Sequence, residues 1–169
     1  MSPELHPLCE SMADDLAVLA NDVSIFNNVR DRFPHPYTLA NAREFISISS
    51  AQKPPNEFAI LVSGQLTGVC GIIPGDDVHR FTAEIGYWIG APFRGRGIAS
   101  AAVIRLSHIA FERGFERLHA GVYEWNKASC RVLEKAGFQL ESKQRRAVHK
   151  NGRTASQFVY VRLNGESHE

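Results

Sequence analysis

Residues 87–100 read YWIGAPFRGRGIAS, and they are the most informative stretch of this chain. The stretch opens as an apolar strand, turns at Gly95 and Gly97, and enters an amphipathic helix predicted over 98–113. The first N–H groups of a helix have no partner inside it and carry positive partial charge, so they bind phosphate readily. Glycine also lets the backbone approach an anion closely. The order of strand, glycine turn and helix therefore predicts a phosphate-binding cradle.

Arginines stand beside both glycines, and the side chains of Arg94 and Arg96 would add charged hydrogen-bond donors. An isolated GxG is more often a plain loop with solvated arginines. Two other phosphate-binding folds fit less well. A dinucleotide-binding turn needs GxGxxG, but Ser100 stands where the third glycine belongs, and the strand predicted over 118–123 has no acidic residue for a ribose. The Walker pattern GxxxxGK[ST] is absent from the sequence.

Apolar spacing along the rest of the sequence predicts a mixed α/β fold in one layered domain. Helices are expected over 12–21, after an N-cap at Thr38, and over 127–136 before Gly137. Strands are expected over 58–62, 66–73, 81–89, 118–123, 138–143 and 156–162. The last two strands are expected to be joined by a loop with a turn at Asn151-Gly152.

The composition excludes several classes of protein. Nineteen basic and eighteen acidic residues leave a net charge of +1, so neither nucleic acid nor a membrane surface is expected as a partner. The three cysteines form no CxxC pair and the seven histidines no HxxxH pair, which argues against a disulfide framework and a metal site. No run approaches the roughly 20 apolar residues of a membrane span. We expect one cytoplasmic domain over 1–169, with a polar tail from about 164.

Three motifs carry a resemblance to a known family. Arg94-x-x-Gly97-x-Ala99 resembles the acetyl-CoA pyrophosphate motif, Q/R-x-x-G-x-G/A, of the GCN5-related N-acetyltransferase (GNAT) superfamily. Two further segments resemble its RimJ/RimL-like subgroup: the strand Ala83–Ile89, and Asn126-x-x-Ser129 followed by Gly137-Phe138. The motifs stand in the family order, and weaker similarity begins at Leu5, so the resemblance covers nearly the whole chain.

The resemblance implies the GNAT fold, a central, twisted, mixed but mostly antiparallel sheet of about six to seven strands with helices on both faces. The strands splay at the acetyl-CoA site. It also implies acetyl-CoA as the co-substrate and no metal. The cofactor-binding residues that it implies are Trp88, Ile89, Gly90, Arg94, Gly95, Arg96, Gly97, Ile98, Ala99, Ser100, Asn126 and Ser129. The position of Asn126 suits a helix N-cap equally well.

The implied reaction is that of a transferase, the direct attack of a neutral primary amine on the thioester within a ternary complex. Alkyl amines titrate at about 8 to 10.4, so a general base would raise the reactive fraction near neutral pH. Glu84 is the candidate base, because burial between its apolar neighbours would raise its pKa. A structural role for Glu84, exposed on its strand or paired with an arginine, is equally open.

The departing thiolate also needs a donor. Many members of the superfamily place a tyrosine where this sequence has Leu133. Ser129 is the substitute that the subgroup suggests, and Tyr123 is the reserve candidate. The alternative for Ser129 is an ordinary polar residue one turn into a helix. Cys130 is better explained as a small core residue than as an acyl carrier.

The acceptor pocket is expected at the variable front of the fold, with Phe33 and Tyr37 joining Glu84 as substrate-binding residues. Both aromatic rings are explained equally by packing of their proline-rich loop. The resemblance implies a protein or peptide N-terminal amine, or a small-molecule amine, as acceptor; a homodimer stays open. Two rival functions are a non-catalytic CoA-binding sensor or interaction module and a nucleotide-binding regulator.

Overall fold

The computed structural model describes residues 2–166, and its contacts divide the chain into two compact units. The first unit contains the residues up to Gly71 together with Tyr87–Ala102. The second contains Ile72–Gly86 and the residues from Val103 onward. The prediction of a single domain over 1–169 stays a prediction.

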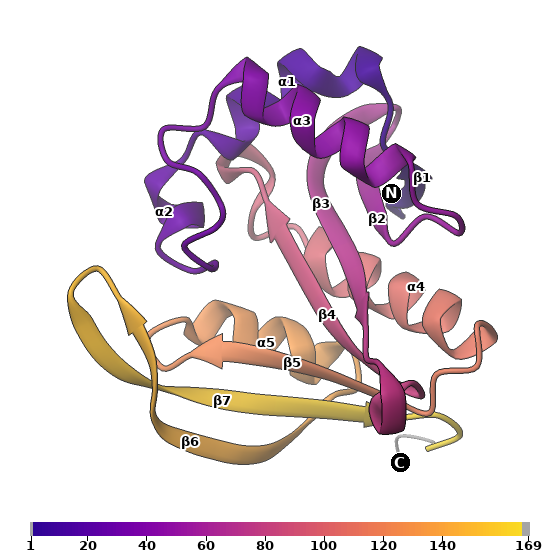
Figure 1. The fold of residues 1–169 in the computed structure, drawn as a ribbon, viewed down its shortest axis with the longest axis vertical. Helices are drawn as coiled ribbons and strands as arrows, with labels where there is room; N and C mark the ends of the chain where they lie inside the picture. Colours follow the sequence, from indigo (N-terminus) through magenta and orange to yellow (C-terminus); the bar gives the residue numbers. More distant parts are fainter. Residues whose placement is uncertain (1, 167–169) are drawn as a thin grey trace. The chain divides into compact units, whose positions relative to one another are not determined.

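After its first strand the chain forms three successive α-helices and then three strands, and from the fourth strand to the sixth, strands and α-helices alternate (Figure 1). The strands are β1 (Glu4–Pro7), β2 (Glu57–Val62), β3 (Gln65–Pro74), β4 (Thr82–Ile89), β5 (Arg117–Tyr123), β6 (Gln139–Lys150) and β7 (Arg153–Leu163). The α-helices are α1 (Ala13–Ala20), α2 (Val23–Phe26), α3 (Leu39–Ser50), α4 (Ile98–Glu112) and α5 (Lys127–Lys135). The strands are hydrogen-bonded in the order β1-β2-β3-β4-β5-β7-β6, and β4 and β5 run parallel. The predicted mixed, mostly antiparallel sheet is therefore confirmed.

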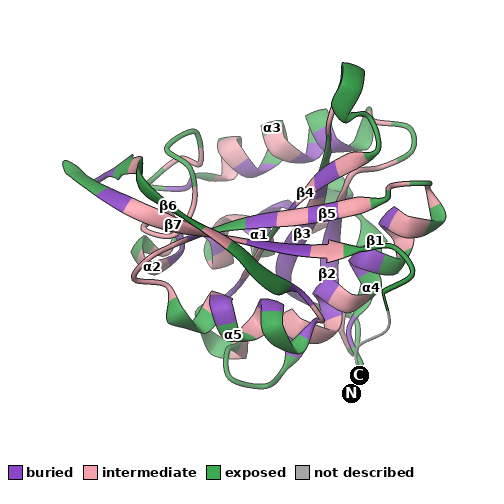
Figure 2. Ribbon diagram, turned by 90° about the horizontal axis from the view of Figure 1, so that it is seen from below, coloured by how far each residue is buried: buried purple, intermediate pink, exposed green. Residues whose placement is uncertain are grey.

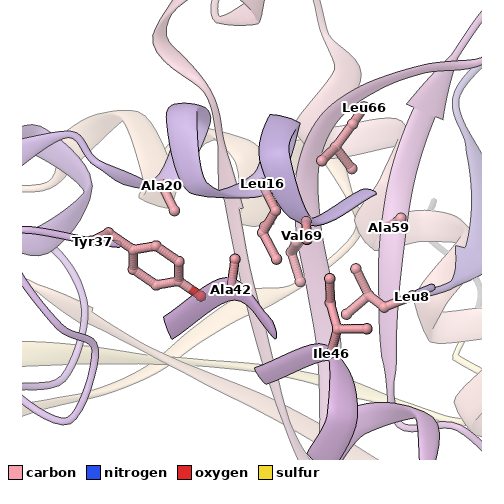
Figure 3. Packing of buried hydrophobic residues seen from close by; sticks show 10 residues of the cluster. Leu8, Leu16, Ala20, Tyr37, Ala42, Ile46, Ala59, Leu66 and Val69 are labelled. Carbon is pink, nitrogen blue, oxygen red and sulfur yellow. The ribbon is translucent and has the colours of Figure 1, made fainter. Parts of the chain in front are cut away.

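The first unit packs helices α1 and α3 together with strands β2 and β3. Helix α3 begins as the sequence predicted, because Thr38 forms a capping box in which its hydroxyl accepts a bond from the Asn41 N–H at 3.2 Å. Ala42 and Ile46, one turn apart on the same face of α3, are buried. Figure 3 shows these side chains meeting Leu16 of α1 and Val69 of β3.

The second unit places α5 on one face of strands β5 and β7. The Tyr160 hydroxyl of β7 donates to Glu134 at 3.0 Å, and the Arg162 guanidinium donates to the carbonyl of Ala136 at 3.1 Å. Along β5 the side chains alternate, with Leu118, Ala120 and Val122 buried. Leu133 of α5 is fully buried as well.

The two closing strands are longer than predicted. Strand β6 extends to Lys150 and β7 starts at Arg153, so the expected long loop between them is wrong. Asn151-Gly152 alone makes the turn, with φ angles of 52° and 73°, a left-handed pair typical of tight hairpins. The periodicity failed here because β6 is exposed along most of its length, so no apolar alternation marks it (Figure 2).

The short elements β1 and α2 were not predicted either. At the C-terminus, Asn164 to Glu166 are exposed, although the Asn164 N–H donates to the carbonyl of Glu116 at 3.0 Å. The remainder of the predicted polar tail, residues 167–169, lies outside the described residues. Within residues 2–166, no helix combines the length and the apolar character that a membrane crossing would require.

Candidate active site

The cradle between β4 and α4 has the backbone that its glycines predict. Gly95 and Gly97 have φ angles of 75° and 76°, in the left-handed region that other residues avoid. No atom lies within 4 Å of the position that a Cβ would take at either glycine. The glycines are therefore required for conformation and not for space. The first helical bond closes from the Ala101 N–H to the Gly97 carbonyl at 3.2 Å, and Gly95 and Gly97 are exposed to solvent.

The guanidinium of Arg94 is held by three groups of the first unit. Its Nε donates to the carbonyl of Ile89 at 3.0 Å, and its Nη1 donates to the hydroxyl of Ser24 at 2.8 Å. Its Nη2 donates to the carboxylate of Asp22 at 3.2 Å. The side chain thus spans from the end of β4 to the N-cap of α2. Arg96, by contrast, is exposed, with its guanidinium 6.0 Å from the Phe93 ring centroid.

Glycines also fix the end of β4 against its neighbours. The Gly90 N–H donates to the carbonyl of Thr67 on β3 at 2.8 Å. A Cβ at Gly90 would lie 2.7 Å from Leu19, and a Cβ at Gly68 would collide with the carbonyl of Trp88. Gly68 therefore needs to be glycine because backbone approaches it, whereas at Gly90 the end of the Leu19 side chain would have to move to admit a Cβ.

An aromatic cluster joins the proline-rich loop to the end of β4. The Phe33 ring lies 5.0 Å from that of Tyr37 and 6.2 Å, edge to face, from that of Trp88. Tyr37 is only 6% exposed, and burial raises the pKa of its hydroxyl to about 12. Its backbone N–H donates to the side chain of Asn21 at 3.0 Å. This burial favours the packing alternative for Tyr37, whereas Phe33 is half-buried beside Trp88.

In the second unit, the β5–α5 turn brings Tyr123, Asn126 and Ser129 together. The Asn126 N–H donates to the carbonyl of Tyr123 at 2.8 Å, and the Asn126 side chain accepts from the Ser129 N–H at 3.2 Å. Asn126 therefore is the N-cap of α5, which was one of the two roles that the sequence left open. The ring of Tyr123 lies 5.3 Å from that of Trp125.

Glu84, on β4, lies apart from the Tyr123–Ser129 group, although it shares a face of the sheet with Tyr123. It is half-buried between the buried residues Ala83 and Ile85, and the β4–β5 register pairs it with His119. Paired residues on neighbouring strands share a face, so Glu84 and His119 point to the same side as Tyr123. Tyr123 is four residues further along β5, roughly 13 Å away at the rise of a strand. Sequence reasoning missed His119, because only the strand register places it opposite Glu84.

The remaining candidates for acid chemistry lie in the core. Cys130 is buried, in agreement with its interpretation as a small core residue, and Leu133 cannot donate a proton. Burial raises the pKa of Tyr160, and hydrogen bonds with Cys130 and Glu134 raise it further. Among the described residues, no three His, Cys, Asp or Glu side chains are grouped as a metal site would need.

A family model described as an acetyltransferase (GNAT) domain matches residues 4–139. The chain belongs to the GNAT acetyltransferase family. This GNAT enzyme is therefore an acyltransferase, and the matched range contains β4, the cradle and α5, on which the sequence prediction rested.

Relatives of this GNAT protein carry similar names. The SPbeta prophage-derived uncharacterized N-acetyltransferase YokL of Bacillus subtilis (strain 168) is 25% identical over 146 residues, 80% of this chain and 81% of that protein. The putative ribosomal N-acetyltransferase YdaF of the same organism is 36% identical over 111 residues, 65% of this chain and 60% of that protein. These N-acetyltransferases agree with the family assignment.

Solved structures share the fold. The ribosomal-protein alpha-N-acetyltransferase RimL, in complex with coenzyme A, matches with a TM-score of 0.86 at 22% identity, covering 96% of this chain and 94% of that chain. The predicted GNAT fold is therefore confirmed.

Proposed function

We propose that this enzyme transfers the acetyl group of acetyl-CoA to a primary amine, by direct attack of the amine within a ternary complex. The acceptor is the N-terminal amine of a protein or peptide, or the amine of a small molecule. N-acetyltransferase activity follows from the family, while the acceptor and the mechanism are our proposal. The names of YdaF and RimL, which refer to ribosomal substrates, favour a protein N-terminus.

The observation that carries the proposal is the open glycine cradle. Its two left-handed glycines expose consecutive backbone N–H groups at the start of α4, an arrangement that binds phosphate oxygens. In our proposal the N–H groups from Gly95 to Ser100 hold the pyrophosphate of acetyl-CoA, and exposed Arg96 adds a charged donor. Arg94 would support the cradle from beneath, because its guanidinium is bonded to Asp22, Ser24 and Ile89 and its backbone N–H donates to the carbonyl of Ala91 at 3.4 Å.

The strand before the cradle would take the pantetheine arm. Backbone groups of Trp88 and Ile89 would bond to the pantetheine amides as an added strand would. Gly90, whose N–H donates to the carbonyl of Thr67, would fix the end of β4 beside the arm, and Asn126 would meet the cofactor while still capping α5. These assignments extend the family resemblance to named groups of this chain.

Glu84 is the general base in this proposal, acting on the amine directly or through water. Its register partner His119 is a second group through which a proton could leave the amine. Ser129 would donate a hydrogen bond to the thiolate, with Tyr123 as the reserve, since both flank Asn126 at the β5–α5 turn. Phe33 and Glu84 would line the acceptor site, and Tyr37 would support it from the core.

The test is thiol release from acetyl-CoA with a panel of N-terminal peptides, amino acids, polyamines and aminoglycosides. We expect at least one class of amine to raise release above the rate without acceptor. Acetyl-CoA that raises the melting temperature while every acceptor stays silent would instead favour the non-catalytic CoA-binding module. A larger rise in melting temperature with ATP or NAD than with acetyl-CoA would count against both the acetyltransferase and the CoA-binding module.

A further inference from the structure

The β6–β7 hairpin concentrates positive charge in a chain whose net charge is only +1. Residues 142–165 contain no aspartate and no glutamate. Their six cationic side chains are Lys143, Arg145, Arg146, Lys150, Arg153 and Arg162. The hairpin is therefore a local source of positive potential, although the molecule as a whole has almost none.

Within the hairpin, β6 leaves the ladder at one place. Residues 145–147 of β6 face the single residue Ser156 of β7, which makes an enlarged β-bulge. The pairs on either side are Gln144 with Gln157 and Val148 with Ala155. Arg146 has a φ angle of 55°, in the left-handed region that is unfavourable for an arginine. Bulges re-aim side chains, and such strain is concentrated at functional sites.

The two arginines of the bulge are available to a ligand. Both are exposed, and among the described residues neither forms an ion pair with a carboxylate. In contrast, Arg153 lies 3.9 Å from the carboxylate of Glu124. Arg145 and Arg146 line a hollow of about 400 Å³ that is partly open to solvent. A guanidinium matches the two oxygens of a carboxylate or phosphate in a bidentate arrangement.

The bulge lies near the candidate catalytic residues of the same unit. Tyr123 pairs with Gln157 of β7, which pairs with Gln144 beside the bulge, and the Glu124 N–H donates to the Ser156 carbonyl at 3.0 Å. Two strand spacings separate Tyr123 from Gln144, about 10 Å. An extended peptide covers that distance in roughly three residues.

In the proposed function the thioester sulfur lies beside Ser129 and Tyr123, so the nitrogen that attacks this thioester also lies near Tyr123. We propose that the Arg145–Arg146 bulge binds an anionic group of the acceptor, so that the enzyme prefers amines whose molecule carries a carboxylate or phosphate roughly 10 Å from the nitrogen. For a peptide acceptor this places the acidic group at about the third or fourth residue. This inference rests on the proposed acetyl transfer, but its binding step can be measured without turnover.

The experiment compares three labelled peptides of one length that differ at the third and fourth residues, which are Asp-Glu, Asn-Gln or a phosphoserine pair. Binding is followed by fluorescence anisotropy in the presence of CoA, at low and at physiological salt. We expect the Asp-Glu or the phosphoserine peptide to bind at least about tenfold more tightly than the Asn-Gln peptide, with the difference shrinking as salt rises. The peptide that binds more tightly of these two shows whether the site prefers a carboxylate or a phosphate.

The variants are Arg145→Gln and Arg146→Asn, the latter because asparagine tolerates a left-handed backbone. Each should reduce the preference for the anionic peptide, and Arg145→Lys should retain part of it. The matched control is Arg80→Gln, an exposed arginine that precedes β4 at the opposite end of β5 from Tyr123. The control should keep the preference, and melting temperatures should confirm that all variants fold.

Equal binding of the three peptides, or a preference that survives both bulge variants, would overturn the inference. A preference that the bulge variants abolish supports it even if no peptide is acetylated. That result would contradict the proposed acetyl transfer to peptides but not the anion-binding site. Acetylation of the Asn-Gln peptide as fast as the others, with equal binding, would leave the transferase standing and remove the anion site.

Discussion

Asp22 and Arg94, 72 residues apart in sequence, form an ion pair with a 3.2 Å separation between Oδ2 and Nη2. The other carboxylate oxygen of Asp22 accepts bonds from the backbone and the hydroxyl of Ser24 at 2.8 and 2.6 Å. One aspartate therefore caps α2 and also orients the arginine that opens the phosphate cradle. Arg94 is in turn bonded to the end of β4 through the Ile89 carbonyl.

We predict that Asp22→Ala weakens acetyl-CoA binding, although Asp22 is not expected to touch the cofactor. The variant frees Arg94 and removes the cap, so that ordering the cradle on binding would cost about 1–2 kcal/mol more. The affinity for acetyl-CoA would fall roughly 5- to 30-fold. Titration calorimetry with acetyl-CoA measures the change, and turnover at saturating acetyl-CoA should fall much less. Asp15→Ala, at an exposed aspartate of α1, is the control. An unchanged dissociation constant for Asp22→Ala would show that the ion pair does not order the cradle.

The same aspartate predicts a pH dependence of stability. Hydrogen bonds from Ser24 are the largest cause that lowers the pKa of Asp22, burial opposes them, and the charge of Arg94 adds to them. Because the folded pKa lies below the ordinary value of 3.8, the ionised carboxylate stabilises the fold above that pH. This stabilisation is lost as the pH falls through the lower, folded pKa.

Wild type and Asp22→Asn should therefore differ in free energy of unfolding by about 0.5–1 kcal/mol near neutral pH, a magnitude reduced by partial exposure to solvent. The difference should shrink in strongly acidic solution, as measured by denaturant unfolding across the pH range. A difference that stays constant into the most acidic conditions at which the protein folds would contradict the assignment to Asp22.

Gly97→Ala should damage the cradle specifically. An alanine at a φ angle of 76° costs on the order of 1 kcal/mol, and relaxation of the backbone would turn the N–H groups away from the phosphate. Gly64→Ala is a matched control, because Gly64 has a φ angle of 78° in the β2–β3 turn and is equally open to a Cβ. Both variants should lose similar stability in thermal unfolding, but only Gly97→Ala should lose affinity for acetyl-CoA. Equal affinities of Gly97→Ala and Gly64→Ala for acetyl-CoA would argue against phosphate binding at the Gly95–Gly97 turn.

Arg96→Ala should weaken acetyl-CoA binding without changing stability, because its guanidinium is exposed and stacks only distantly on Phe93. The expected loss is roughly tenfold, as for one charge-assisted bond. Raising the salt concentration should reduce the difference in acetyl-CoA affinity between Arg96→Ala and wild type. A loss that does not depend on salt would point to a packing role for Arg96 instead.

Glu84→Gln should lower turnover by about 10²-fold while leaving the affinity for acetyl-CoA unchanged, if Glu84 is the general base. The deficit should be greatest at lower pH, where less of the amine is already neutral. His119→Gln should produce a smaller deficit of the same form, since the register places it beside Glu84. Glu112→Gln, at an exposed glutamate of α4, controls for loss of charge. Identical pH–rate profiles for wild type and Glu84→Gln would make the assignment wrong.

The sequence alone determined the features that depend on a few adjacent residues. The glycine pair of the cradle, the caps at Thr38 and Asn126, and the turn at Asn151-Gly152 were all predicted. Each follows from a local preference for a left-handed φ angle or for a side-chain cap, so the neighbouring residues suffice to encode it.

The tertiary structure decided which distant residues meet. Arg94 looked like a phosphate ligand until the fold placed Asp22 beside it, and His119 had no role until strand register set it opposite Glu84. Tyr37 entered the core, and the basic bulge formed in what had been expected to be a loop. These relationships depend on contacts between segments far apart in the chain, and local periodicity carries no information about them.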